Sequence, residues 1–131
     1  MFIFQKSLEG NQNIDYLKNK IDTFILENKI DIKEKIFIGY ATGNYIGSNI
    51  YYCNKKSKKI ATFLKDNALN FDVKIRCFSF LKSDEYDIKI EIGYIENINE
   101  QKYIENAVKN IFLAIEKTYF IINKGYYFPI E

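Results

Sequence analysis

The 131-residue sequence contains no histidine and no tryptophan. A Ser-His-Asp or Cys-His nucleophile needs an imidazole base, and most catalytic zinc sites are built from histidine ligands. Neither arrangement can be assembled from the residue types present. We therefore expect no catalytic triad, no metal site and no cofactor in this chain.

Cysteine and arginine are scarce. Cys53 and Cys77 are the only cysteines, they form no CxxC pattern, and both lie in apolar or aromatic segments. Free cysteines are therefore expected in preference to a disulfide. Arg76 is the only arginine, and the net charge is only +2. Because recognition of phosphate and guanine favours arginine and a strong basic bias, nucleic acid is not an expected partner.

Long hydrophobic runs are missing as well. The most apolar stretch, residues 111–122, is interrupted by Glu116 and Lys117, so no membrane span is expected. The apolar residues before Gln5 are too few for the hydrophobic region of a signal peptide. Together with the scarcity of cysteine, these features favour a cytoplasmic protein.

Hydrophobic residues make up 47% of the chain and aromatic residues 17%. A chain of this length should bury roughly 70% of the surface that it exposes when unfolded, which suits a single domain over residues 1–131. Hydrophobic periodicity alternates between strand and helix spacing. Strands are expected at residues 2–4, 35–41, 49–53, 72–77 and 87–94, and helices at residues 13–28, 55–69 and 100–120. The alternation predicts an α/β fold with a single-layer, mixed or mostly parallel sheet of about five to six strands and about three helices packed on it.

Three segments are candidate sites with a simpler structural interpretation. Gly39, Gly43 and Gly47 lack the GK[ST] ending of a phosphate-binding loop, so turn formation is the simpler explanation. The lysines of residues 55–59 could contact an anionic polymer, although such a cluster is more often a solvated helix face. The acidic residues of segment 84–87 fit no Ca²⁺ loop, and a solvated turn is expected there.

Glu91 is the carboxylate of most interest. It lies in the segment IKIEIGYIEN, where Ile90 and Ile92 should face one side of a strand and Glu91 the other. Ligand crevices in α/β sheets form near the carboxyl ends of strands, which is where Glu91 should lie. A solvent-facing glutamate without a function is the simpler alternative.

From residue 36 to residue 120, the order of segments resembles that of the zinc-dependent N-acetylmuramoyl-L-alanine amidases. The corresponding segments are IFIGYATGN, GSNIYYC, KSKKIATFLKD, IEIGYIEN and IENAVKNIFLAIEKTYF. The best match is IEIGYIEN, in which Glu91, Gly93, Tyr94 and Asn97 fall on the family motif Glu-x-Gly-Phe-x-x-Asn. The resemblance implies an amidase-like α/β fold.

The resemblance also implies that catalysis has been lost. The family binds Zn²⁺ through two histidines and a glutamate, and it uses the glutamate of the Glu-x-Gly-Phe motif in catalysis. Gly39 occupies the position of one ligand histidine, while Leu8 and Asn11 correspond to the other histidine and to the ligand glutamate. Of the catalytic positions only Glu91 is retained. Without the ion there is no metal-activated water to attack an amide, so the resemblance implies a pseudoenzyme.

The leading hypothesis is a catalytically inactive, amidase-like domain that acts as a binding or regulatory protein. Its ligand would be a muropeptide or another cell-wall precursor. The residues expected to bind it are Gly39, Tyr40, Asn44, Glu91 and Asn97. The N-terminal third is shorter than that of the family, which leaves open a homodimer in which a second copy compensates.

The alternative is a small protein-interaction module, such as an inhibitor or immunity protein encoded by a phage or mobile element, with no small-molecule ligand. Abundant tyrosine motivates it, because tyrosine is enriched at protein interfaces. The tyrosines expected to be exposed are Tyr51, Tyr52, Tyr126 and Tyr127.

Overall fold

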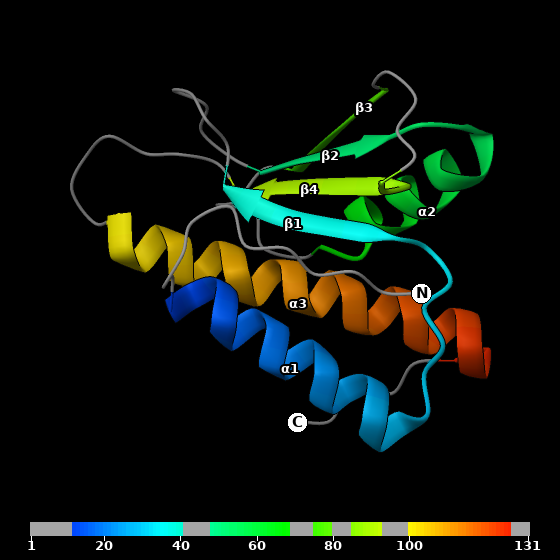
Figure 1. Ribbon diagram of the computed structural model, residues 1–131, viewed down its shortest axis with the longest axis horizontal. Coiled ribbons are helices and arrows are strands. Elements are labelled where there is room, and N and C mark those ends of the chain that lie inside the picture. Colours follow the sequence, from blue (N-terminus) through cyan, green and yellow to red (C-terminus); the bar gives the residue numbers. More distant parts are fainter. Residues whose placement is uncertain (1–11, 41–47, 69–74, 80–84, 93–99, 127–131) are drawn as a thin grey trace.

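The computed structural model describes residues 12–40, 48–68, 75–79, 85–92 and 100–126 (Figure 1). The elements in chain order are α1 (Gln12–Asn28), β1 (Ile36–Tyr40), β2 (Ser48–Tyr52), α2 (Lys55–Asp66), β3 (Ile75–Ser79), β4 (Ile88–Ile92) and α3 (Glu100–Lys124). The strand expected at residues 2–4 lies outside the described residues, as do Leu8, Asn11, Asn44 and Asn97.

The α/β class, the three helices and the mixed sheet are confirmed, but the strand number is not. The described residues form four strands, not five to six. The four strands expected after the first helix, at residues 35–41, 49–53, 72–77 and 87–94, all form. β3 spans Ile75–Ser79 and pairs Ile75 with Ser48 of β2, whereas residues 72–74, where this strand was expected to begin, lie outside the described residues.

The sheet has the strand order β1-β4-β2-β3. β1 runs parallel to β4 and β2 runs parallel to β3, whereas β2 and β4 are antiparallel. β2, α2 and β3 therefore form a parallel crossover unit, in which the helix returns the chain to the start of the next strand. β4 is central, since it pairs with β1 on one side and with β2 on the other.

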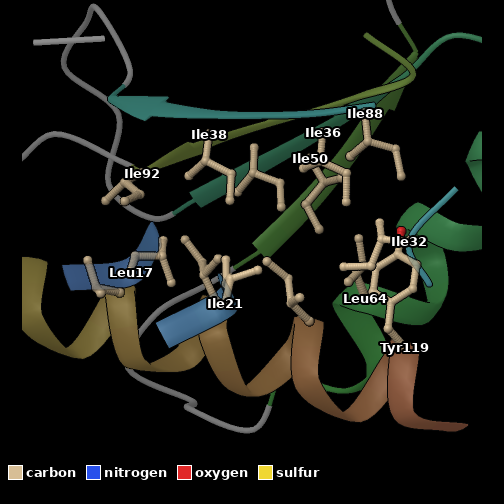
Figure 2. Packing of buried hydrophobic residues seen from close by; sticks show 14 of the residues in the cluster. Leu17, Ile21, Ile32, Ile36, Ile38, Ile50, Leu64, Ile88, Ile92 and Tyr119 are labelled. Atoms are coloured by element: carbon tan, nitrogen blue, oxygen red, sulfur yellow. The ribbon is translucent and has the colours of Figure 1, made fainter. Parts of the chain in front are cut away.

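The helices lie on one face of the sheet, with α1 and α3 side by side beneath it (Figure 1). Along β4 the buried isoleucines Ile88, Ile90 and Ile92 alternate with Lys89 and Glu91, so the isoleucines face the helices. Figure 2 shows Ile88 and Ile92 on the side of the sheet that faces the helices. Buried side chains that meet there are Leu17 and Ile21 from α1, Leu64 from α2, Tyr119 from α3, and Ile36, Ile38, Ile50, Ile88 and Ile92 from the sheet.

α2 begins at a capping box. The Asn54 side chain accepts a hydrogen bond from the backbone N–H of Ser57 at 2.8 Å, and the Ser57 Oγ accepts one from the backbone N–H of Asn54 at 3.0 Å. These bonds satisfy backbone donors that the first turn of a helix leaves without partners. In the described part of the chain, no helix is both long enough and apolar enough to cross a membrane.

A buried hydrogen bond joins α3 to the segment before β1. The hydroxyl of Tyr119 donates to Oε1 of Glu34 at 2.8 Å, and only 1% of Tyr119 and 9% of Glu34 are exposed. Burial raises the pKa of Tyr119 far above its ordinary value, and the charge and hydrogen bond of Glu34, together with the charge of Asp87, raise it further. The phenol therefore stays protonated in the folded protein at a pH where the unfolded chain has lost the proton.

We expect the free energy of unfolding to decrease as the pH rises above about 10, the ordinary pKa of tyrosine. The folded state binds more protons than the unfolded state there, so alkali favours unfolding. Tyr119→Phe should flatten this alkaline decrease. At neutral pH it should lower the free energy of unfolding by about 1–3 kcal/mol, because Glu34 loses its buried donor. Urea unfolding of both proteins across neutral and alkaline pH measures the two effects. An unchanged alkaline decrease in the variant would refute this role of Tyr119.

Candidate functional site

The face of the sheet opposite the helices carries two rows of side chains. Residues that pair in register across a sheet place their side chains on the same face. The pairs Phe37–Lys89, Lys89–Tyr51 and Tyr51–Phe78 form one row across the four strands. The pairs Gly39–Glu91 and Glu91–Asn49 form the second row. We call the first, together with Tyr86, the aromatic row, and we call Gly39, Glu91 and Asn49 the polar row.

The structure brings together two of the five residues predicted to bind a ligand. Gly39 on β1 and Glu91 on β4 are in-register neighbours in the polar row. Tyr40 is the last residue of β1, and its side chain is not among those described. Asn44 and Asn97 lie outside the described residues. Their part in a site stays a prediction.

Glu91 is paired with a cation. Its Oε1 lies 2.9 Å from Nζ of Lys89, and only 15% of its side chain is exposed. Its neighbours in the polar row, Gly39 and Asn49, are buried. The carboxylate is therefore committed to an ion pair on a largely covered surface. The sequence contained a signal for this pair, since residues two apart in a strand lie on the same face.

Lys89 is the centre of the aromatic row. Its Nζ lies 5.7 Å from the ring centroid of Phe37 and 6.0 Å from that of Tyr51, within the range of cation–π attraction. Two further ring pairs extend the row, Phe37 with Tyr86 at 5.7 Å and Tyr51 with Phe78 at 5.8 Å. A continuous line of rings with one ammonium group at its centre thus crosses the sheet.

The charge of Lys89 is stabilised by these contacts. Burial by itself lowers the pKa of Lys89, but the hydrogen bond and the negative charge of Glu91 outweigh burial, with contributions from Tyr86 and Tyr51. The net effect raises the pKa, so Lys89 is an ammonium ion at neutral pH. The sequence analysis did not single out Lys89, Phe37 or Phe78, because their proximity depends on strand order.

The other candidate segments have structural roles. The lysines of residues 55–59 are exposed on α2, as a solvated face would be, and Nζ of Lys58 lies 6.0 Å from the ring of Tyr52. In the acidic segment, Asp84 lies outside the described residues and Asp87 accepts a hydrogen bond from the backbone N–H of Lys35 at 2.9 Å. This bond fixes the connection before β1 against the start of β4.

Cys53 and Cys77 are free thiols, and both are partly exposed, not fully buried. The thiol of Cys77 donates to the backbone oxygen of Ala61 at 3.5 Å. Burial raises the pKa of Cys77, which lowers the fraction of reactive thiolate at neutral pH. Cys77 is therefore a packing residue beneath α2.

The residues present do not fit the zinc ion that the family resemblance implies. Gly39, which the resemblance aligns with a ligand histidine, has no side chain to coordinate a metal, and the carboxylate of Glu91 is held by Lys89. No histidine exists anywhere in the chain to replace the missing ligand. No step of a metal-dependent hydrolysis can be assigned to these residues.

No protein-family model matches the sequence, and no curated protein matches it. Among solved structures, the chain is similar to the catalytic domain of CwlV, an N-acetylmuramoyl-L-alanine amidase from Bacillus (Paenibacillus) polymyxa var. colistinus, with a TM-score of 0.41 and 18% sequence identity. The match covers 76% of this chain and 63% of that domain, so the chain spans less than two thirds of the domain's length. A likeness of this degree assigns neither a family nor an activity.

We expect the Lys89–Glu91 pair to be energetically coupled. Lys89→Met and Glu91→Gln should each lower the free energy of unfolding by about 1–2 kcal/mol, because each leaves a partly buried partner without its counter-charge. The double variant should lose less than the sum of the two, with a coupling energy of about 1 kcal/mol. Urea unfolding of the four proteins gives this coupling.

Lys109→Met is the matched control, since Lys109 is exposed on α3, and it should change stability by no more than about 0.5 kcal/mol. Strictly additive losses at Lys89 and Glu91 would contradict the coupling.

Proposed function

We propose that this chain is a non-catalytic binding protein and that the aromatic row is its contact surface. The observation that carries the proposal is the line of rings around Lys89 on the face that the helices leave uncovered. Phe78 is 42% exposed, and Phe37, Tyr51 and Tyr86 are partly exposed. Contiguous aromatic surface of this kind is typical of interaction sites.

Sheet architecture supports the same surface. All-parallel sheets are covered on both faces, whereas sheets with antiparallel pairs, such as β2 with β4 here, can leave part of one face in contact with water. Here the described helices pack on one face only (Figure 1). A molecule bound over the aromatic row would remove its rings from water.

A muropeptide or related cell-wall precursor is the proposed ligand. The amidase-like order of segments supports this class, and so does the chemistry of the face. Aromatic rings pack against the apolar faces of sugar rings, while the Tyr51 hydroxyl and the ammonium of Lys89 can bond to hydroxyl or carboxylate groups. This surface differs from the one predicted from the sequence, which included Gly39 and Glu91 of the polar row. The proposed contact lies on the neighbouring aromatic row, because Gly39 and Asn49 are buried.

The proposal also holds that the chain does not hydrolyse amides. Two observations support it: Gly39 lies where the family has a ligand histidine, and the carboxylate of Glu91 is neutralised by Lys89 at 2.9 Å.

A protein partner is the second candidate, as an inhibitor or immunity protein would have. It is favoured by exposed aromatic side chains elsewhere, Tyr16 at 47% and Tyr126 at 52% exposed. Of the other tyrosines expected at an interface, Tyr51 and Tyr52 are partly exposed, and Tyr127 lies outside the described residues. A stoichiometric protein recovered with the wild type and lost with Phe78→Ala would favour this candidate.

Nuclear magnetic resonance titration with a purified disaccharide-peptide tests the ligand. At millimolar concentration, we expect shifts of backbone amides near Phe37, Tyr51, Phe78 and Lys89. Phe78→Ala and Tyr51→Ala should each weaken binding about tenfold, as expected for loss of one stacked ring.

Tyr16→Ala on α1 is the control and should leave the affinity unchanged, since Tyr16 is equally exposed but lies on the helical side. Absence of shifts, or equal affinity in Phe78→Ala, would exclude the aromatic row as the muropeptide site. Release of peptide from the disaccharide-peptide by the purified protein would refute the non-catalytic part of the proposal.

A further inference from the structure

The aromatic row crosses the sheet at right angles to its strands. Phe37, Lys89, Tyr51 and Phe78 lie on β1, β4, β2 and β3, and each pairs in register with the next. Neighbouring strands are about 4.8 Å apart, so the row extends over about 14 Å from Phe37 to Phe78. The row is therefore a narrow line of side chains, one from each strand, and suits an elongated ligand that lies across the strands.

The orientation of the rings favours a ligand with flat apolar faces. The planes of Phe37 and Tyr86 differ by 36°, and those of Tyr51 and Phe78 differ by 32°. The two rings of each pair thus have similar orientations and are not packed edge to face. Each of the four rings is at least partly exposed. Such pairs offer a broad apolar surface against which the C–H groups of a sugar ring can pack.

The ion pair beside the rings compensates the charge of the row. Nζ of Lys89 lies 2.9 Å from Oε1 of Glu91, and 33% of the Lys89 side chain and 15% of the Glu91 side chain are exposed. The ammonium donates hydrogen bonds and the carboxylate accepts them, so one sugar hydroxyl can accept from Lys89 and donate to Glu91. A ligand carboxylate would instead compete with Glu91 for Lys89 and would be repelled by the charge of Glu91.

We propose that the aromatic row binds the glycan part of the ligand, as an extended chain of β-linked pyranose units that runs across the strands, and that the peptide part does not contact the row. This inference rests on the proposed function, because it concerns the same surface. A β-linked pyranose unit is about as long as the spacing between strands, so about four units lie over the row, one above each strand. A neutral glycan also matches the compensated charge of Lys89 better than the carboxylates of a peptide do.

The seating of the chain follows from exposure. Phe78 is 42% exposed, more than its partner Tyr51, so the first two units lie over this pair. A third unit lies over Lys89, where its hydroxyls meet the ion pair, and a fourth lies over Phe37.

Nuclear magnetic resonance titration with peptide-free oligomers of β-linked N-acetylglucosamine, from one unit to six, tests this arrangement. We expect the affinity to rise about threefold to tenfold with each added unit up to about four, and then to level off once the row is covered. The backbone amides that shift should be those near Phe37, Lys89, Tyr51 and Phe78. The free peptide of the disaccharide-peptide should shift none of them at equal concentration.

Two matched variants test the direction of the chain. Phe37→Leu and Phe78→Leu each keep an apolar side chain and remove the flat ring, at opposite ends of the row. Phe37→Leu should remove the gain from the fourth unit and leave the affinity for two units unchanged, whereas Phe78→Leu should weaken oligomers of every length from two units upward. Amide spectra without ligand check that both variants are folded, and the length dependence of the wild type needs no variant.

Three results would overturn the inference: an affinity that does not depend on oligomer length, shifts of the aromatic row by the free peptide alone, or an equal loss at every length in Phe37→Leu. If the intact disaccharide-peptide still shifts Tyr51 and Phe78 in these cases, the row remains the contact surface and only the glycan assignment fails. Absence of shifts with both the oligomers and the disaccharide-peptide would exclude the inference and the proposed muropeptide site together.

Discussion

The packing of the β4 isoleucines against the helices is the constraint on which the rest of the structure depends. Ile88, Ile90 and Ile92 are almost completely buried, and β4 pairs with both β1 and β2. Because side chains alternate along a strand, burying these isoleucines requires Lys89 and Glu91 to face the other side. A shift of register by one residue would bury the two charges and expose the isoleucines, so this arrangement is strongly favoured. The composition of the face opposite the helices follows from it.

The residues around the Lys89–Glu91 pair determine the chemical character of this surface. β1 and β2 place Phe37 and Tyr51 on either side of Lys89, and Glu91 neutralises the lysine. The surface that results is aromatic and nearly neutral, which suits a ligand with apolar ring faces better than a polyanion. The same geometry holds the carboxylate of Glu91 in an ion pair with Lys89.

Glu34 shows how the hydrophobic core extends to a second polar region. Tyr119 belongs to the buried cluster through its ring, yet its hydroxyl contacts Glu34, which together with Asp87 lines a small polar hollow at the edge of the sheet where β1 and β4 begin. The segment KIDIKEK does not identify the buried partner of Glu34, because Tyr119 belongs to α3, a helix far along the chain. The alternation of Ile30, Ile32 and Glu34 as buried residues indicates that the segment faces the core at every second position.

Hydrophobic periodicity by itself determined the three helices, the four internal strands and the inward face of β4, since these depend on the spacing of apolar residues within short segments. The motif around Glu91 also correctly placed that residue on the outward face of its strand. The order β1-β4-β2-β3 was not determined in this way, because strand order depends on which surfaces pack best after the chain folds back. Tertiary structure alone therefore decided that Gly39 adjoins Glu91, that Lys89 lies between Phe37 and Tyr51, and that Glu34 meets Asp87 at one hollow. Contacts between residues about fifty positions apart leave no trace in local spacing.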